Sequence, residues 1–431
     1  MPYNIADYHA ETVSAHLPSQ FDSLQIVGMF EAVRQASDPG LFSIGEGGSI
    51  MNGVPIVMGD KIFFGACDRR IYCLDFKGKE MWHIETEGPI SGYMAAERKA
   101  LYVGSHDRNM YAVSLNGEIL WKFATEGKIF SRPLVLHDRI IFGSEDQNLY
   151  ALSKEGELLW KFATKGPIAS GPALGKGSIY FGSYDKNLYS VNLDGSLNWT
   201  FETNSLIMSN PIFSNGIIYF PSFHKRLYAV TEEGRLLWTL GLKADIWANA
   251  ALHDDVLYLG GRDGIMKAIS LEGKLLWGFH ANDATSVEPA FDREKIYFGS
   301  ADGNVYAVVL KDHSLAWKAP TIGPIWAAPA IHRKILLLGN WGAKFYAFNA
   351  KDGDILWDFM TSISSQAPFE ADLQQKADNA LHSFTWTPET YRKEEKYGSA
   401  RSLNEAVVYG PMEPTYGGTK KEYLGRRKGY R

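Results

Sequence analysis

Residues 149–162 read LYALSKEGELLWKF, and variants of this segment recur along most of the chain. In each copy a Trp follows a Gly by four residues, as Trp160 follows Gly156, and only the seventh copy has His313 in place of the Gly. The Trp residues are 39 or 40 residues apart, at Trp82, Trp121, Trp160, Trp199, Trp238, Trp277, Trp317 and Trp357. A fixed period of this length is the signature of a repeat architecture. The chain therefore contains eight copies of one structural unit.

Each repeat has the pattern of four short strands. In residues 168–203, the apolar segments ASGPAL, IYFG, LYSV and LNWTF are separated by turns rich in Gly, Asp, Asn and Lys. Such turns join antiparallel neighbours. A single four-stranded blade cannot bury both faces, so the blades must pack around a ring. We predict an all-β fold, an eight-bladed β-propeller over residues 51–361, in which the recurring Trp packs between blades.

Composition limits the possible partners and locations. The 431-residue chain has a formal net charge of −5, which gives no basic field for nucleic acid. The first twenty residues, MPYNIADYHAETVSAHLPSQ, contain neither the basic nor the apolar part of a secretory signal, and no apolar run reaches the length of a membrane span. The sequence predicts a cytoplasmic protein without a membrane segment and does not favour nucleic acid as a partner.

The segment L-Y-A-L-x-x-x-G-x-L-x-W-x-F resembles the pyrroloquinoline-quinone (PQQ) type propeller repeat over about residues 53–360. That family includes quinoprotein alcohol and glucose dehydrogenases and a non-enzymatic propeller lipoprotein of outer-membrane barrel assembly. For the enzymes the resemblance implies a vicinal Cys pair at the quinone and a Ca²⁺ ion. Cys67 and Cys73 are six residues apart, and repeats of 39 or 40 residues leave no long insertion for a substrate pocket. We expect the non-enzymatic branch, without a cofactor, metal or catalytic residue.

The eight copies can be compared with one another at the strand nearest the axis. The residue before a recurring Pro varies between blades, and residues two positions earlier share its face because side chains alternate along a strand. The polar and aromatic residues at these positions are Tyr93, Arg132, Asn210, Asn249, Glu288, Trp247 and Trp326. Arg132 and Glu288 are four blades apart in a ring of eight, so we expect them to face each other across the axis.

Two interpretations of these axial residues remain. One is an aromatic-rimmed site for a small ligand or a peptide loop. The other is a water-filled channel whose polar side chains merely satisfy one another. No acid pair, metal cluster or nucleophile–base arrangement accompanies them, so the sequence assigns no reaction class.

The two ends of the chain lie outside the repeats and carry opposite charge. Residues 1–50 hold six acidic residues and one basic residue, with a predicted helix at about residues 23–36. Residues 362–431 contain another predicted amphipathic helix and a Tyr-rich segment that ends in KKEYLGRRKGYR. This segment suits an arm that docks on a partner or a sister subunit, and a disordered basic tail is the alternative. The candidate docking residues are Tyr409, Tyr416, Tyr423, Arg426, Arg427 and Tyr430.

These features predict a non-catalytic protein-interaction scaffold, an accessory or structural subunit of a larger cytoplasmic complex. Its propeller faces and terminal arms would contact other subunits or a second copy of the chain. The alternative function is a small-ligand-binding or quinone-dependent oxidoreductase-type propeller that uses the axial channel. Fold alone does not decide between them.

Overall fold

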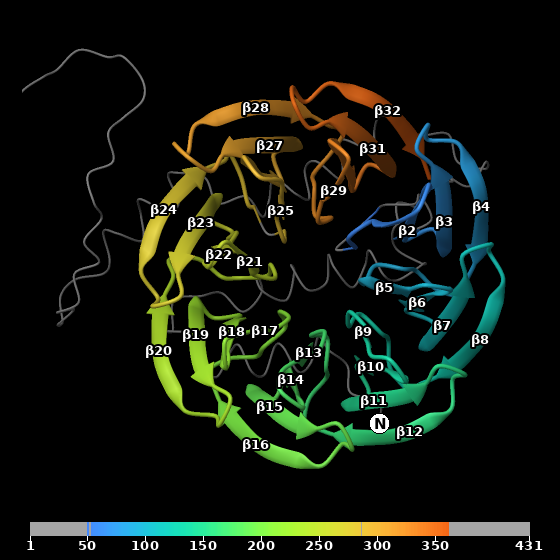
Figure 1. The fold of residues 1–431 in the computed structure, drawn as a ribbon, viewed down its shortest axis with the longest axis vertical. Helices are drawn as coiled ribbons and strands as arrows, with labels where there is room; N and C mark the ends of the chain where they lie inside the picture. The colour runs from blue at the N-terminus through green and yellow to red at the C-terminus, as the bar shows by residue number, and fades with distance from the viewer. Residues whose placement is uncertain (1–49, 51–52, 286, 362–431) are drawn as a thin grey trace, which may run out of the picture. The chain divides into compact units, whose positions relative to one another are not determined.

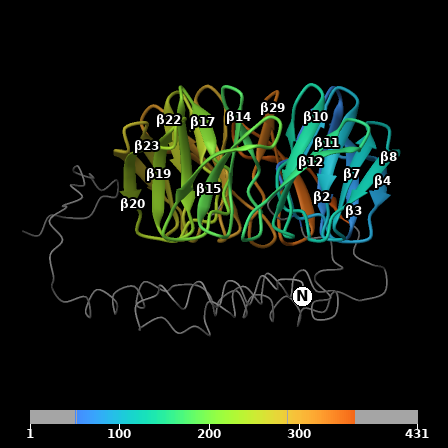
Figure 2. The ribbon, with the colours of Figure 1, turned by 90° about the horizontal axis from the view of Figure 1, so that it is seen from below.

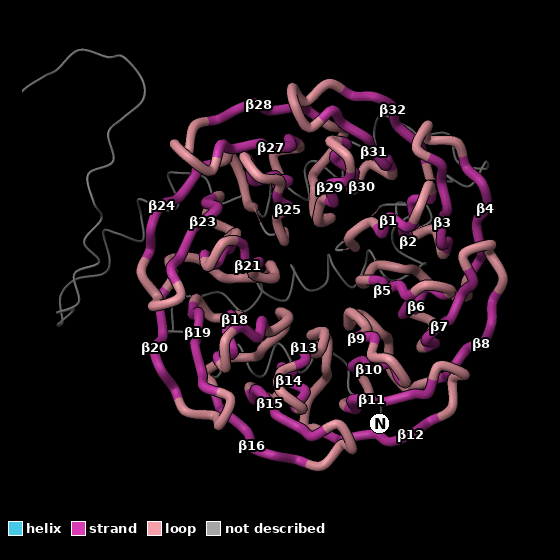
Figure 3. The backbone as a smooth tube through the Cα atoms, viewed as in Figure 1, coloured by secondary structure: helices cyan, strands magenta, loops and turns pink. Residues whose placement is uncertain are grey.

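A computed structural model describes residue 50 and residues 53–285 and 287–361, which form a ring of eight blades (Figure 1). Each blade is a four-stranded sheet whose strands follow one another in sequence order, and each strand is antiparallel to the previous one. The described residues contain strands and loops but no helix (Figure 3). The predicted all-β fold of eight four-stranded blades is confirmed. The predicted terminal helices and the residues of the C-terminal arm lie outside the described residues.

The first strand of each blade lies nearest the axis and the second lies behind it (Figure 1). The first strands are β1 (Ile56–Met58), β5 (Met94–Glu97), β9 (Leu134–Val135), β13 (Ala173–Leu174), β17 (Ile212–Ser214), β21 (Ala251–His253), β25 (Ala290–Phe291) and β29 (Ala330–His332). The second strands are β2 (Lys61–Ala66), β6 (Ala100–Gly104), β10 (Arg139–Gly143), β14 (Ser178–Gly182), β18 (Ile217–Ser222), β22 (Val256–Leu259), β26 (Lys295–Gly299) and β30 (Ile335–Gly339).

The third strand of each blade is followed by the outer strand at the rim (Figure 1). The third strands are β3 (Arg70–Asp75), β7 (Asn109–Ser114), β11 (Asn148–Ser153), β15 (Asn187–Asn192), β19 (Arg226–Thr231), β23 (Ile265–Ser270), β27 (Asn304–Val309) and β31 (Lys344–Asn349). The outer strands are β4 (Glu80–Glu85), β8 (Ile119–Ala124), β12 (Leu158–Ala163), β16 (Leu197–Glu202), β20 (Leu236–Gly241), β24 (Leu275–His280), β28 (Leu315–Pro320) and β32 (Ile355–Met360).

The hydrophobic core lies between blades rather than within one. Second and third strands are buried on both faces, and their side chains join those of the next blade, as Ile141 and Leu149 join Phe181 and Val191. The strands of all blades span a similar height of the ring (Figure 2). Every blade therefore depends on its two neighbours to bury its faces.

The outer-strand Trp and the recurring Gly meet across the blade boundary. The Nε1 of Trp160 donates to the carbonyl oxygen of Leu193 in the next blade at 2.9 Å, and Gly195 lies on the indole ring. A Cβ on Gly195 would be 2.7 Å from that ring, and its φ of +86° also favours glycine. In the seventh repeat, His313 stacks on Trp277 at 4.4 Å between ring centroids. Each Gly therefore packs on the Trp of the preceding blade, not on the Trp that follows it in its own repeat.

The ring closes without a blade shared between the two ends of the described chain. Strands β1–β4 form one sheet and β29–β32 form its neighbour. The Nε1 of Trp357 donates to the carbonyl oxygen of Phe76 at 2.9 Å across this seam. The amide of Ile50 donates to the carbonyl oxygen of Asn340 at 3.0 Å, and Ile50 is only 1% exposed. Ile50, which was expected to belong to the N-terminal extension, is thus part of the closing contact.

Candidate functional site

The connections into the innermost strands carry polar side chains to the axis. Equivalent positions in successive blades are 39 or 40 residues apart. Tyr93, Arg132, Asn210, Asn249 and Glu288 come from the second, third, fifth, sixth and seventh blades. The repeat dictates where these positions lie but not which side chains occupy them. They can therefore carry a property that the fold itself does not require.

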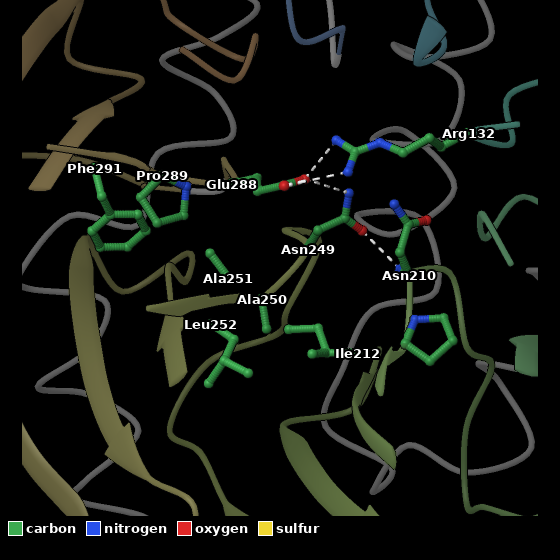
Figure 4. A pocket seen from close by; sticks show the side chains of 11 residues that line it. Arg132, Asn210, Ile212, Asn249, Ala250, Ala251, Leu252, Glu288, Pro289 and Phe291 are labelled. Carbon is green, nitrogen blue, oxygen red and sulfur yellow. Dashed lines mark hydrogen bonds and ion pairs between the residues drawn. The ribbon is translucent and has the colours of Figure 1, made fainter. Parts of the chain in front are cut away.

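Arg132 and Glu288 meet across the axis. The Nη2 of Arg132 is 2.9 Å from the Oε2 of Glu288, and its Nη1 is 3.4 Å from Oε1 (Figure 4). The residues are 156 positions apart, which is four repeats of 39, so they belong to opposite blades. Their side chains are 34% and 21% exposed, respectively. A two-point bond between a guanidinium and a carboxylate is directional, so it fixes both side chains at the centre of the ring.

A second contact crosses the axis beside the first. The Nδ2 of Asn249 donates to the Tyr93 hydroxyl at 2.7 Å and to the Glu288 carboxylate at 3.3 Å. The Oδ1 of Asn249 accepts a hydrogen bond from the backbone N–H of Asn210 at 2.8 Å (Figure 4). The guanidinium of Arg132 lies over the Tyr93 ring, 4.3 Å from its centroid. These five residues form one network, which we call the axial network, and it links two pairs of opposite blades.

Charge and burial set the protonation of the axial network. Burial disfavours the charge on Arg132, but the neighbouring Glu288 carboxylate and Tyr93 outweigh it and raise the pKa of Arg132. Burial, followed by the charge of Glu288, raises the pKa of Tyr93. At neutral pH, Arg132 is a cation and Tyr93 an uncharged phenol whose oxygen accepts from Asn249. The network can hold a ligand by hydrogen bonds and charge. Arg132 and Tyr93 both keep their protons at neutral pH, so neither can act as a base.

A cavity of about 410 Å³ lies against the axial network. Arg132, Asn210, Asn249 and Glu288 form its polar side (Figure 4). Its apolar side comes from the first strands of the fifth to seventh blades and the residue before each of them. The residues of that side are Pro211, Ile212, Ala250, Ala251, Leu252, Pro289 and Phe291. The cavity is asymmetric, since the other five blades contribute only Arg132 to its wall.

Trp247 and Trp326 do not join this site. Trp247 contacts Phe223 edge-to-face at 5.4 Å and packs on a separate apolar cluster around Leu206. Trp326 is not among the residues that line the cavity. Trp247 and Trp326 lie in the connections that precede β21 and β29, so the alternation of a strand does not place them beside Asn249 and Ala328. The aromatic rim expected from the sequence is therefore not part of the cavity.

Several residues of the site were not predicted. Gly171 donates its amide to the Oδ1 of Asn210 at 2.5 Å, and a Cβ there would lie 2.7 Å from the Cβ of Arg132. The contact of Tyr93 with Asn249 could have been found, because these residues are also four repeats apart. Nothing in the repeat singles out Ile212, Leu252 or Phe291, since similar apolar residues follow the recurring Pro in most blades.

His106 lies in the turn between β6 and β7, where burial keeps its imidazole uncharged. Its Nε2 is 2.6 Å from the Ser91 hydroxyl, and its ring is 4.5 Å from that of Phe130. Burial, with a smaller contribution from Lys128, lowers the pKa of His106 to about 3. The unfolded chain takes up this proton near the usual pKa of about 6.5. Acid should therefore favour the unfolded state between these two values.

We expect the wild type to lose about 1–2 kcal/mol more unfolding free energy than His106→Gln when the pH falls from 7.5 to 5.0. Below pH 6.5 the unfolded wild type binds a proton that the folded protein cannot bind, and the variant lacks this group. Urea titrations of both proteins at the two pH values measure the difference. An equal loss in both proteins would show that His106 is not held uncharged by the fold.

The axial residues do not fit a Ca²⁺–quinone centre. Ca²⁺ takes six to eight oxygen ligands. The Glu288 carboxylate is already bound by Arg132 and Asn249, and the Oδ1 atoms of Asn210 and Asn249 accept backbone amides. Within residues 50, 53–285 and 287–361, no three His, Cys, Asp or Glu side chains are grouped as a metal site. Cys67 and Cys73 are buried and unbonded to each other.

Comparison with family models identifies the repeat. The model described as "Outer membrane protein assembly factor BamB" matches five overlapping segments, residues 42–135, 67–166, 145–277, 194–327 and 262–382. The chain belongs to this PQQ-repeat propeller family. A search of curated proteins found no match. The outer strand of each blade of this PQQ-repeat propeller carries the Trp of the G-x-x-x-W segment or of its His313 variant.

Solved structures show that the PQQ-repeat propeller fold serves different proteins. BamB from Moraxella catarrhalis is 18% identical, with a TM-score of 0.56, and the match covers 69% of this chain and 91% of that one. The quinohemoprotein alcohol dehydrogenase ADHIIG from Pseudomonas putida HK5 is 14% identical, with a TM-score of 0.57 and coverages of 69% and 70%. The computationally designed protein Ika8 is 17% identical, with a TM-score of 0.55 and coverages of 62% and 85%. These likenesses show the fold alone.

No helix among the described residues of this PQQ-repeat propeller is long and apolar enough to cross a membrane. Every blade consists of strands, and the outer strands turn only alternate side chains toward the neighbouring blade.

Proposed function

We propose that this protein is a non-catalytic interaction scaffold, an accessory or structural subunit of a larger assembly. The observation that carries the proposal is an apolar rim. In five blades the outer strand exposes two consecutive aliphatic side chains immediately before its Trp, as Leu236 and Leu237 do at 49% and 50% exposure. The pairs are Ile119 and Leu120, Leu158 and Leu159, Leu236 and Leu237, Leu275 and Leu276, and Ile355 and Leu356.

These side chains are not needed to join the blades, because the Trp and Phe of the same strand do so. In β20 the exposed fractions alternate after the two leucines, with Trp238 and Leu240 turned inward. Exposed apolar surface repeated around a rim is typical of contact with other proteins. The outer strands are also sheet edges, whose free backbone groups can pair with an added strand. Membership of a family described as an assembly factor supports the same function.

The proposal also includes the two ends of the chain, which carry opposite charge. The N-terminal residues are acidic and residues 420–431 are basic. Tyr409, Tyr416 and Tyr423, with the basic residues near the C-terminus, are proposed to contact a partner subunit or a second copy. A cytoplasmic location remains part of this proposal. The alternative, binding of a small molecule on the axis, is favoured by the cavity beside the axial network.

Photo-crosslinking in the source cells tests the scaffold proposal. A photoreactive amino acid is placed in the full chain at Leu237 or at Tyr423, and at Asp254, whose side chain is 89% exposed in the turn between the two inner strands β21 and β22, as the control. We expect one partner, or a second copy, to be linked from Leu237 or Tyr423 and not from Asp254. Leu236→Lys should then weaken recovery of that partner. A chain that is monomeric by light scattering and yields no crosslink at either position would contradict the proposal.

A further inference from the structure

We infer that the axial cavity binds an uncharged small molecule that has a carbonyl or amide oxygen and an apolar body. This site does not depend on the scaffold function, since it lies on the axis and not at the rim. The inference follows from an unused hydrogen-bond donor, the internal neutralisation of charge, and an apolar wall on one side only.

The unused donor is the side-chain amide of Asn210. Its Oδ1 accepts the Gly171 amide at 2.5 Å, which fixes which end of the side chain faces the fourth blade. Its Nδ2 is buried and has no hydrogen-bond partner among the described residues, and in Figure 4 this nitrogen lies on the side toward Asn249. A buried donor without a partner is costly, so the site favours a molecule that brings an acceptor oxygen.

The polar side of the cavity is neutralised internally. The charges of Arg132 and Glu288 compensate each other at 2.9 Å. The amide of Asn249 is used at both ends, by Tyr93 and Glu288 through Nδ2 and by Asn210 through Oδ1. An ionic ligand would lose its hydration without finding a free counter-charge. The network therefore selects an uncharged molecule.

The apolar wall provides the second half of recognition. Ile212, Leu252 and Phe291 come from three successive blades and lie on the same side of the cavity (Figure 4). The volume of about 410 Å³ is much larger than a single bridging water requires. It lies within the range of pockets that bind small organic ligands. The unpartnered donor of Asn210 and the apolar wall together suit a molecule with one polar end.

Three probes of similar shape test which ligand charge the cavity accepts. They are the uncharged 3-phenylpropanamide, the anion 3-phenylpropanoate and the cation 3-phenylpropylammonium. Binding to the full chain is followed by ligand-observed NMR. We expect the amide to bind with a Kd on the order of 1 mM, as ligands of this size do. The two ions should bind at least ~10-fold more weakly, because neither finds a free counter-charge.

Two variants place the binding site. Asn210→Asp keeps the oxygen that accepts from Gly171 but removes the donor, so amide binding should fall ~10-fold and preference should shift to the ammonium probe. Leu252→Ala, which leaves the network intact, should weaken amide binding ~3-fold or more. Asn198→Asp on β16 is the matched control and should change nothing. Equal binding of all three probes, binding of none, or an unchanged affinity in both Asn210→Asp and Leu252→Ala would overturn the inference. None of these outcomes affects the crosslinks expected at the rim.

Discussion

Trp357→Ala is expected to lower the free energy of unfolding by about 3 kcal/mol and to open the ring locally between its first and last blades. The indole of Trp357 lies on Gly78 of the first blade and donates to the carbonyl oxygen of Phe76. Truncation removes a large apolar contact and leaves a half-buried carbonyl without its donor. The side chain is only half-buried, so the loss should be at the lower end of the range for Trp truncation.

Trp357 lies at the boundary between the first and last blades, and this position distinguishes Trp357→Ala from the same substitution at another blade boundary. Trp160→Ala removes an equivalent contact between the third and fourth blades, which remain joined by the chain itself. Both variants should lose similar stability in urea. Only Trp357→Ala should accelerate hydrogen exchange selectively in β2 and β31, because those strands face each other across the seam. The same exchange pattern in both variants would show that the seam is no weaker than the other interfaces.

Much of the fold follows from the repeat in the sequence. The spacing of Trp160 and its equivalents gives the number of blades, and the short apolar segments give four strands in each. The partner of each Trp could not be predicted so directly. G-x-x-x-W places Gly156 and Trp160 in one repeat, yet Gly156 packs on Trp121 of the preceding blade. That pairing depends on how far each blade is turned against the next, which no single repeat contains.

The sequence predicts which blades carry the axial residues, but not which of their side chains reach the cavity. A separation of four repeats places Arg132 opposite Glu288, and they meet there. The same arithmetic applies to Tyr93 and Asn249, whose contact was not predicted. The period of a strand would put Trp247 on the same face as Asn249, but both residues lie in the connection before β21, where that period does not apply. The absence of a side chain at Gly171 leaves room for Arg132, since a Cβ there would lie 2.7 Å from the Cβ of Arg132, and the repeat does not predict this Gly.

Arg132→Met should lower the free energy of unfolding by about 2 kcal/mol. The Met side chain keeps much of the apolar stem but leaves the Glu288 carboxylate without its cation in the middle of the ring. Complete burial would make the loss larger, but the two side chains are 34% and 21% exposed, so water screens part of the charge. Urea denaturation at pH 7 measures the loss. Lys122→Met is the control, because its contact with Glu87 is exposed, and its stability should change little.

A double-mutant cycle on Arg132 and Glu288 tests most directly the central claim that opposite blades are joined on the axis. The free energies of unfolding of the wild type, Arg132→Met, Glu288→Gln and the double variant give the coupling between two residues 156 positions apart. We predict a coupling of about 1–2 kcal/mol. Either single substitution already breaks the ion pair, so the second substitution removes a charge that no longer has a partner. Additive effects, with a coupling below about 0.5 kcal/mol, would contradict an axis closed by this pair.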